Sequence, residues 1–581
     1  MSSHLFQTRY LAGPLLLAVA APTLLAYNVS PSPTFLNQAL SVGLWGVVVL
    51  LARPLWPGRG VWPVLAALAL VAAAVGASWG PGALPASLAL SALVLLAAAA
   101  CVLCAAAGAR RRGDGTELFS AWCWALAVTG GLNVLVAMVQ VFAPDLPDGR
   151  LISASSIPGR AVGNLRQPNH LSSVLLWSAI AVVALSGLKR LRWTAALPML
   201  AALMLAVVLT ASRTGLLSVL LLALWGLIDR RLPKDTRGLL LAAPLLYAAA
   251  WGGVAWWGAQ ATHQFSGAAR LAETDISGSR FGIWANSLAL IRANPWSGVG
   301  FGEFNLAWTL TPFPDRPTAF FDHTHNLPLQ LAVELGLPLA VLVMALLLWA
   351  LGTAAWRGLG RRVVVPEVGI AQRAALMMVL MIGLHSLLEY PLWYAYFLLP
   401  TAWAWGFALG RDDAPAASAP QRAAGVSPVL IVGALLMGLG ALLSVLDYRR
   451  VAVIFYVSPN AAPLPARIAA GQESVLFAHH ADYAALTYAV TVPPGESFAR
   501  ATHHLLDTRL MVAWIRALHA QGQPDAARFV AARLREFGRS ESGDLFEPCS
   551  DAANLPVAER PFQCSPPERA WAWREFLNRP R

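Results

Sequence analysis

The sequence predicts an all-α protein that crosses a membrane about thirteen times and ends in a soluble, mainly helical domain. Hydrophobic residues make up 57% of its 581 positions and charged residues only 12%. Soluble domains carry about 25% charged residues, so we exclude a single soluble core, a disordered chain and a nucleic-acid-binding protein. Apolar runs of membrane-spanning length recur as far as residue 447, whereas the residues from 448 onward are polar and mixed in charge.

The expected membrane spans follow from hydropathy and from the need for about 20 mostly apolar residues in a helix that crosses a bilayer. They lie near residues 10–27, 35–52, 62–78, 84–107, 118–142, 170–187, 193–211, 214–229, 238–258, 326–353, 370–388, 391–410 and 428–447. The first span resembles a cleavable signal peptide at Ala18-Val19-Ala20. Because another span follows almost at once, we expect it to stay uncleaved.

Positive charge predicts the orientation of these spans. The net charge of +12 comes from small clusters between the apolar runs. With an odd number of spans and a cytoplasmic N-terminus, these clusters fall in the cytosol, as the positive-inside rule requires. They are Arg9; Arg53 and Arg59; Arg110, Arg111 and Arg112; Lys189, Arg190 and Arg192; Arg230, Arg231, Lys234 and Arg237; Arg357, Arg361 and Arg362; and Arg411 and Arg422. We therefore expect a transmembrane domain of residues 1–447, with a large outer loop at 259–325, and an outer domain of residues 448–581.

Two outer segments carry arginine where the positive-inside rule disfavours it. Gly163–His170 contains Arg166 and the start of a helix at Pro168, which Asn164 or Asn169 could cap. Ser212–Gly215 is a tight turn that places Arg213 at the membrane–water boundary. Helix N-termini and guanidinium groups both bind phosphate, so these segments predict an anionic ligand. Pairing with lipid headgroups, or simple helix capping, is the alternative.

The outer loop contains a second group of polar residues. Arg280 follows Gly278, and a glycine-rich stretch covers residues 294–304, which could cradle phosphate but is better explained as a structural turn. His323 and His325 form an HxH pair. No third metal ligand is apparent nearby, so a general base is the better interpretation than a metal site.

Polar residues also enter two of the expected spans. Asn326, Gln330 and Glu334 recur every four residues on one helix face, which is typical of a cavity or a helix contact. His385 and Glu389 have i,i+4 spacing and could touch. A carboxylate at membrane depth needs a partner, and an outer arginine is the natural one. The aromatic residues that follow, from Tyr390 to Tyr394, also fit an interfacial belt.

The polar tail contains one recognisable unit. Residues 511–537 predict a helical hairpin with its break at Gly522-Gln523-Pro524, similar to a single tetratricopeptide repeat. Cys549 and Cys564 are spaced for a possible disulfide if the tail lies outside the cytosol. The remaining cysteines lie in apolar runs, where we expect them to act as small hydrophobic residues; they are Cys101, Cys104 and Cys123.

Together these segments resemble the O-antigen ligase-like membrane proteins. The QPNHL stretch from Gln167, the EYPLWYAYFLL stretch from Glu389 and the soluble C-terminal domain are most similar to the bacterial protein (pilin) O-oligosaccharyltransferase branch. The resemblance implies a GT-C-like fold in the bacterial inner membrane, with the active site and C-terminal domain in the periplasm. It implies transfer of a preassembled glycan from undecaprenyl diphosphate to a Ser or Thr hydroxyl of pilin or another periplasmic protein. We expect no cofactor.

The resemblance also implies roles for individual residues. His325 matches the essential loop histidine, and His323 matches less firmly, so either could be catalytic. Arg213 and Arg280 match residues that hold the diphosphate, and we group Arg166 with them. The supporting positions, by resemblance or by proximity in sequence, are Gln167, Asn169, His170, Asn326, Glu389 and Tyr390. Direct attack by the hydroxyl would invert the anomeric centre. The outer loop has no DxD-like motif, so we expect metal independence.

Other functions share part of this pattern. A lipid A-core O-antigen ligase performs the same chemistry on a sugar hydroxyl, and an O-antigen polymerase belongs to the same superfamily. The soluble tail and the QPNH and EYPLWY stretches favour a protein acceptor. A lipid-glycan flippase or transporter would show internal repeats and polar residues spread through the membrane midplane, and neither is visible. A purely structural membrane protein would need neither the outer arginines nor the HTHN segment.

Overall fold

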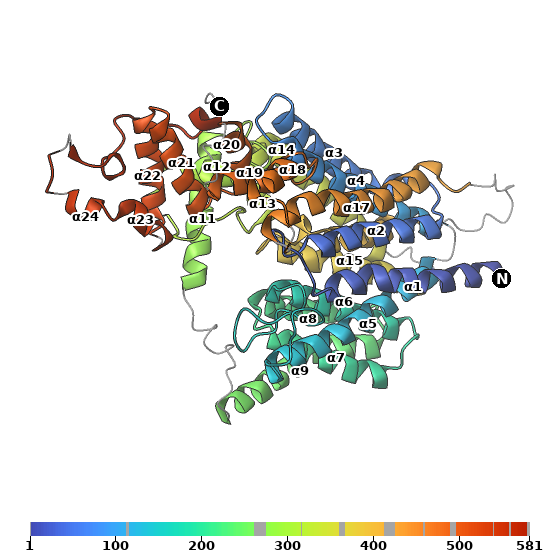
Figure 1. Ribbon diagram of the computed structural model, residues 1–581. Helices are drawn as coiled ribbons and strands as arrows, with labels where there is room; N and C mark the ends of the chain where they lie inside the picture. The colour runs from blue at the N-terminus through green and yellow to red at the C-terminus, as the bar shows by residue number, and fades with distance from the viewer. Residues whose placement is uncertain are drawn as a thin grey trace. The chain divides into compact units, whose positions relative to one another are not determined.

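The computed structural model describes residues 2–111, 115–260, 275–314, 316–359, 366–411, 425–456, 459, 461–488, 495–538, 540–552, 554–556 and 559–577. Every regular element in these ranges is a helix (Figure 1). Residues 261–274 of the expected outer loop lie outside the described residues, as do four of the basic residues, Arg112, Arg361, Arg362 and Arg422. The chain forms two compact units. Unit 1 consists of Met1–Leu68, Leu95–Glu273 and Ala345–Val445, and unit 2 of Ala69–Val94, Thr274–Met344 and Leu446–Arg581.

Unit 1 is a bundle of apolar helices around α6. Its helices are α1 (Ser2–Leu24), α2 (Phe35–Ala52), η1 (Arg59–Val61), α5 (Gly115–Phe142), α6 (Pro168–Gly187), α7 (Trp193–Leu209), α8 (Arg213–Ile228), α9 (Lys234–Gln260), α15 (Pro366–Ser386), η2 (Pro391–Trp393) and α16 (Ala395–Leu409). Helix α6 packs against α5, α7, α8, α9 and α15. It is apolar on all sides and almost wholly buried, as expected for the central helix of such a bundle. The start of α6 is therefore held in a fixed position.

Helices of membrane-spanning length account for most of the predicted spans. Among the described residues, nine helices are long and apolar enough to cross a bilayer. They are α2, η1 with α3 (Trp62–Trp79), α4 (Ala86–Arg110), α5, α6, α9, α14 (Leu337–Leu359), α15 and α17 (Pro428–Phe455). The shorter apolar helices are Tyr10–Leu24 of α1, α7, α8 and α16. Each predicted span corresponds to one of these helices, but the total of thirteen crossings depends on the shorter ones and stays a prediction.

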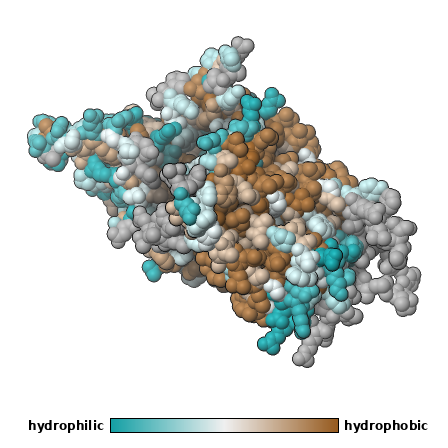
Figure 2. Space-filling view, turned by 90° about the horizontal axis from the view of Figure 1, so that it is seen from below, coloured by the Kyte–Doolittle hydropathy of each residue, from teal (hydrophilic) through white to brown (hydrophobic). Residues whose placement is uncertain are grey.

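Exposed apolar surface fits a lipid environment. Figure 2 shows a broad hydrophobic face on the space-filling view. Helix α17 exposes a continuous row of large apolar side chains, namely Val432, Leu435, Leu436, Leu439, Leu442 and Leu443. A soluble protein rarely exposes such a row, whereas hydrocarbon chains cover it without cost.

The predicted span at 326–353 is two helices, since Gly336 at φ 76° separates α13 (Leu327–Leu335) from α14.

The larger hydrophobic core of unit 2 combines segments far apart in the sequence. This unit contains α11 (Asp275–Ala293), α12 (Phe304–Leu310), α13, α18 (Leu464–Gln472), α19 (Ala478–Thr487), α20 (Gly495–Ala501), α21 (Thr508–Ala520), α22 (Pro524–Glu536), η3 (Ser540–Ser542), α23 (Gly543–Phe546), α24 (Cys549–Ala552), η5 (Phe562–Cys564) and α25 (Arg574–Leu577). Leu290, Trp308 and Val333, on α11 to α13, pack in the same core as Met511 and Trp514 of α21. From the sequence we expected the outer loop and the tail to be separate parts. In the structure, residues of both pack in this core.

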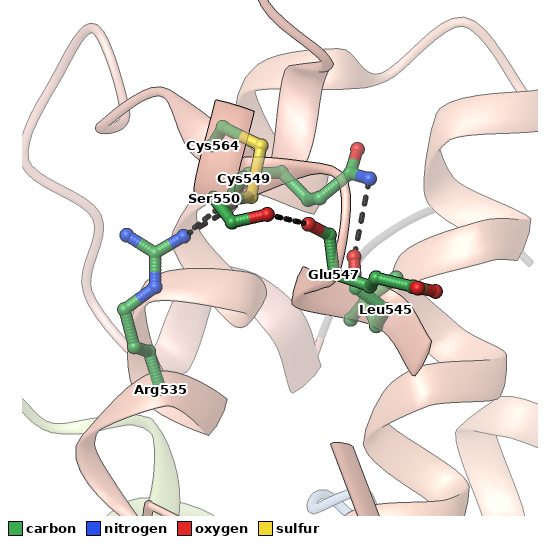
Figure 3. Close-up of a disulfide and its surroundings, with 7 residues drawn as sticks. Arg535, Leu545, Glu547, Cys549, Ser550 and Cys564 are labelled. Carbon is green, nitrogen blue, oxygen red and sulfur yellow. Dashed lines mark hydrogen bonds between the residues drawn. A yellow bond between two sulfur atoms is a disulfide. The ribbon is translucent and has the colours of Figure 1, made fainter. Parts of the chain in front are cut away.

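The tail contains the predicted hairpin and the predicted disulfide. Helices α21 and α22 are separated by a turn at Gly522, which has φ 71°, and Pro524 is the first residue of α22. Cys549 and Cys564 form a disulfide beside Arg535 of α22 (Figure 3). Closing a loop of this length should contribute about 3 kcal/mol through loop entropy. The disulfide therefore stabilises the end of the chain against α22.

Candidate functional site

One group of candidate site residues lies in unit 1, where α6 begins. Gln167 is the N-cap of α6, and its side-chain oxygen accepts a hydrogen bond from the His170 backbone N–H at 2.7 Å. Pro168 follows at the first helical position, where the missing N–H costs nothing. The sequence predicted this helix start but was wrong about its cap, which it assigned to Asn164 or Asn169. Because Gln167 caps the helix, the amide of Asn169 can make contacts with other segments.

Asn169 connects three of the predicted outer segments. Its Nδ2 donates a hydrogen bond to Glu389 Oε1 at 3.0 Å, and its Oδ1 accepts one from Ser212 Oγ at 2.6 Å. Ser212 Oγ in turn caps α8 by accepting the Gly215 backbone N–H at 2.9 Å. Arg213 therefore occupies the first position of α8, half-buried. The sequence did not predict this amide as a partner of Glu389.

Arg166 holds the backbone of a neighbouring loop. Its guanidinium donates to the Ala26 carbonyl at 2.6 Å and to the Pro33 carbonyl at 3.0 Å. Arg166 itself has φ 57°, which is a left-handed conformation that a non-glycine residue adopts at a cost of about 1–2 kcal/mol. These contacts hold it there. An anionic ligand at Arg166 would have to use the other N–H groups of the guanidinium.

Aromatic rings surround His170 behind this network. The His170 ring lies edge-on to Tyr394, with ring centroids 4.7 Å apart, and its Nδ1 is 3.3 Å from the Tyr396 hydroxyl. Tyr390 stacks with Tyr394 at 6.2 Å between centroids. His385, in the last turn of α15, has its Nδ1 2.8 Å from an α6 hydroxyl, that of Ser173. Apart from Asn326, the supporting residues of the sequence prediction thus lie around the start of α6.

A separate group of candidate site residues lies in unit 2, on a loop that carries both histidines. Thr324 anchors it, because its backbone N–H donates to Gln330 Oε1 at 2.8 Å and its carbonyl accepts from Trp284 Nε1 at 2.9 Å. Asn326 ends the loop as the N-cap of α13, where its side chain accepts a backbone N–H at 3.0 Å. Thr324 is fully buried and His325 is half-buried. The loop therefore holds His325 while part of its ring stays accessible.

The two histidines of this loop have different surroundings. His323 Nδ1 lies 3.0 Å from Asp322 Oδ1, which orients the His323 ring. The His325 ring packs edge-on against Phe321, with centroids 5.6 Å apart, and its backbone has φ 55°. Left-handed non-glycine residues held by their surroundings are common at functional sites. This favours His325 over His323 as the residue with the functional role.

Arg280 lies on α11, one turn before Trp284. Positions four apart share a helix face, and Trp284 donates the hydrogen bond that holds Thr324. Helix α11 therefore places Arg280 on the side that contacts the loop of His325. Arg280 and His325, which are 45 positions apart in the chain, thus lie on two segments of unit 2 that contact each other through Trp284 and Thr324.

The glycine-rich stretch at 294–304 pairs with the end of α13. The backbone N–H groups of Val299 and Gly300 donate to carbonyls of α13 at 2.8 and 3.0 Å. Gly298 and Gly336, with φ 66° and 76°, approach so closely that a Cβ on either would collide with backbone of the other segment. The stretch uses its N–H groups in these contacts, which supports the structural-turn interpretation over a phosphate cradle.

A buried carboxylate lies next to this turn. Glu334, in the last turn of α13 and before the candidate span α14, is 6% exposed. Burial raises the pKa of Glu334 to about 8. Hydrogen bonds from the Gly302 and Phe304 backbone and from the Gln330 side chain oppose this, because they stabilise the ionised form. The carboxyl group of Glu334 is therefore a candidate to keep its proton near neutral pH.

Replacing Glu334 with glutamine should flatten the pH dependence of stability. The pKa of this carboxyl is about 8 in the folded protein against an ordinary 4.5. Between these pH values the unfolded chain loses a proton that the folded protein keeps, so the free energy of unfolding falls as pH rises, by on the order of 1 kcal/mol per pH unit. We expect Glu334→Gln to remove this slope when thermal unfolding is measured from pH 5.5 to 7.5. The exposed Glu473 provides a control in Glu473→Gln, and identical slopes in both variants would contradict the assignment.

Comparisons with known proteins find similarity to ligases, a polymerase and oligosaccharyltransferases. Residues 197–344 match the family model described as O-antigen ligase, residues 161–185 match protein glycosylation ligase, and residues 373–542 match the C-terminal part of a virulence factor membrane-bound polymerase. The chain is similar to the general O-oligosaccharyltransferase of Acinetobacter baylyi, at 26% identity over 57% of both chains. It is also similar to the ComP-specific O-oligosaccharyltransferase of that organism, at 24% identity over 52% of this chain and 53% of the relative. The matched region thus spans little more than half the length of each relative.

Proposed function

We propose that this chain belongs to the O-antigen ligase-like family of membrane proteins and is a protein O-oligosaccharyltransferase. It would move a preassembled glycan en bloc from undecaprenyl diphosphate to Ser or Thr hydroxyls of pilin or other periplasmic proteins. The observation that carries the proposal is the loop of His325, which Thr324, Trp284 and Gln330 hold in place beside the helix of Arg280. The names of the two relatives support this activity.

In the proposed reaction His325 acts as the general base. A Ser or Thr hydroxyl is a poor nucleophile, and a histidine within hydrogen-bond reach can take its proton as the oxygen attacks. The oxygen forms a bond to the anomeric carbon of the glycan while the bond from that carbon to the diphosphate oxygen breaks. The pair of electrons leaves with undecaprenyl diphosphate. Attack from the opposite side inverts the anomeric centre.

The arginines would stabilise the negative charge of the leaving group. Arg213 at the first position of α8 and Arg280 on α11 supply guanidinium groups that match phosphate oxygens in a bidentate fork. Charge that develops on the diphosphate is then neutralised without further activation. Arg166 is a third candidate through its remaining N–H groups. We propose that the transfer is independent of metal, so a chelator that abolished transfer by the folded protein would contradict this mechanism.

The remaining polar residues would position these groups. Gln167 and Asn169 fix the start of α6 and, through Ser212, the turn that carries Arg213. Glu389 is held by Asn169, and Asn326 ends the His325 loop. His170 and Tyr390 would line the region around the start of α6. We further propose that the protein lies in the bacterial inner membrane with a cytoplasmic N-terminus, and that residues 448–581 and the reacting groups face the periplasm.

The acceptor can be tested by competition within one cell. Cells would supply one lipid-linked glycan together with a pilin and a complete lipid A-core, with or without this protein. Intact mass of the pilin and gel migration of the lipopolysaccharide report the two products. We expect glycan on the pilin only when the protein is present. Glycan on lipid A-core alone would keep the chemistry and make the protein an O-antigen ligase, and longer lipid-linked glycan with neither product would indicate a polymerase.

The Asn169 network gives a test of positioning within unit 1. Asn169→Asp removes the N–H donor and places a second carboxylate beside Glu389, so we expect at least a tenfold loss of pilin glycosylation. In the double variant Asn169→Asp/Glu389→Gln, the carboxylate is at position 169 and the amide at position 389. An N–H donor and an oxygen acceptor therefore face each other again. Partial recovery in the double variant, at matched membrane levels, would support the hydrogen bond as the cause. Full activity of Asn169→Asp alone would show that the network does not position the reacting groups.

A further inference from the structure

Three histidines that the proposed transfer mechanism does not use meet in unit 2. His479 and His480 begin α19, and His504 follows α20. One ring nitrogen from each histidine can be chosen so that all of them lie within 4.8 Å of one another. The ring centroids are 4.3 Å apart for His479 with either of the others and 4.7 Å for His480 with His504. The sequence did not predict this cluster, because its third member lies 24 positions after His480.

Burial favours the neutral form of each ring in the cluster. Burial lowers the pKa of His504 to about 4, although Asp322 acts in the opposite direction. Burial, together with the neighbouring imidazoles, also lowers the pKa of His479 and His480 well below the usual value. All the rings are therefore neutral at neutral pH, and neutral imidazole is the form that binds metal.

A hydroxyl of α4 contacts the most buried of these histidines. Ser87 Oγ lies 3.0 Å from His479 Nδ1, and both side chains are buried. Metal-binding histidines usually use their second ring nitrogen in such a hydrogen bond, which fixes the tautomer and the ring orientation. With Nδ1 engaged by Ser87, Nε2 of His479 is the nitrogen left for an ion.

We propose that His479, His480 and His504 form a binding site for a divalent transition-metal ion, with Zn²⁺ as its natural occupant. Imidazole ligands suit Zn²⁺, Cu²⁺ and Ni²⁺, and three nitrogens with a fourth position for water complete a tetrahedral Zn²⁺ site. Zn–N distances of about 2.0–2.1 Å correspond to N···N separations of about 3.3 Å, so each ring has to move by less than about 1 Å. Neutral rings that merely pack together are the alternative.

The ion would act as a structural clamp. It would join the start of α19 to the turn after α20 and, through Ser87, to α4. Ser87 at the start of α4, the start of α19 and the turn after α20 all belong to unit 2. None of the three histidines is among the groups proposed for glycan transfer, so this inference does not depend on the proposed function. Removal of the ion should lower thermal stability while the folded protein keeps its transfer activity.

The test uses the full-length protein in detergent, purified without a polyhistidine tag and stripped of metal with EDTA. After incubation with ZnCl₂ and desalting, we expect about one zinc ion per chain by elemental mass spectrometry. Zinc should also raise the midpoint of thermal unfolding, since it binds the folded state selectively. With Co²⁺ as a spectroscopic probe, visible absorption bands of a tetrahedral site should appear and then vanish when Zn²⁺ is added.

Variants of the cluster separate this site from adventitious binding. The double variant His480→Gln/His504→Gln should lose the bound zinc and the cobalt bands. The control is His519→Gln, which changes an exposed histidine that stacks on Phe562 at 3.8 Å in the same unit and should bind zinc normally. Ser87→Ala should weaken zinc binding by about 10-fold or more while keeping all the ligands.

Two results would overturn the proposal. One is a wild-type protein that binds no more zinc than the double variant and shows no tetrahedral cobalt bands. The other is a double variant that binds zinc as tightly as the wild type. If the double variant fails to fold, the proposal is tested by the cobalt spectrum of the wild type and by the zinc affinity of Ser87→Ala. An unchanged zinc affinity in Ser87→Ala would contradict coordination by His479.

Discussion

Replacing His325 with alanine should lower glycan transfer by about 100- to 10,000-fold, which is the usual contribution of a general base. The variant loses the imidazole that would take the acceptor proton, while the contacts that hold the loop come from Thr324, Trp284 and Gln330 and are unchanged. The loop should therefore stay folded, and the loss should appear in the rate and not in the amount of protein. Intact mass of the pilin acceptor, over a time course at matched membrane levels, measures the effect.

His323→Ala is the matched control for this prediction. The two histidines are two positions apart on one loop, but His323 Nδ1 lies 3.0 Å from Asp322 Oδ1. We expect His323→Ala to reduce transfer much less than His325→Ala. The reverse order would assign the base to His323, and two fully active variants would remove this loop from the mechanism.

Replacing Arg316 with alanine should destabilise unit 2 by about 3–5 kcal/mol, because it breaks a buried ion pair from one side. The Arg316 side chain is 1% exposed, and its Nε lies 2.8 Å from Glu536 Oε2 of α22. The same guanidinium donates to the Trp308 carbonyl at 2.9 Å and to the Thr311 carbonyl. It also lies over the Phe537 ring, 4.8 Å from the centroid. One side chain thus joins the segment after α12 to the end of the tail hairpin.

Burial lowers the pKa of Arg316 to about 10, and Glu536 acts in the opposite direction, so the guanidinium stays charged at neutral pH. The effect is measured by thermal or denaturant unfolding of the full-length protein in detergent. Arg533→Ala is the control, since Arg533 contacts the same carboxylate at 2.9 Å but is more exposed and lies on the same helix. We expect Arg533→Ala to lower the free energy of unfolding by about 1 kcal/mol or less. Equal unfolding midpoints for Arg316→Ala and the wild type would show that this contact does not hold the segments together.

Local patterns in the sequence were enough to predict many elements of the fold. Hydropathy predicted a span at 35–52, and α2 begins at Phe35 and ends at Ala52. The Gly522–Pro524 break predicted the hairpin of α21 and α22. The spacing of Cys549 and Cys564 allowed the disulfide that is present. Each of these features depends on residues that are close in the chain, so their side chains and backbone preferences determine it directly.

The candidate site was predicted only as separate segments. The sequence singled out the stretches around Asn169, Arg213, Glu389 and His325, because arginine, histidine and amides are unusual beside apolar spans. It missed that Gln167 caps α6 and that Asn169 therefore bonds to both Glu389 and Ser212. A cap can be assigned only when the backbone angles at the helix start are known, and several polar residues there compete for it.

Contacts between distant parts of the chain were decided by the tertiary structure alone. Nothing local to Arg316 predicts Glu536, and nothing local to His480 predicts His504. Hydropathy and helix periodicity depend on neighbours within about 20 positions, which is the length of one span. The packing of a shared core selects which distant side chains meet, and in unit 2 that core combines α11 to α13 with the tail. The amino-acid sequence by itself thus determined the helices and the chemistry available, and the packing of those helices determined which groups act together.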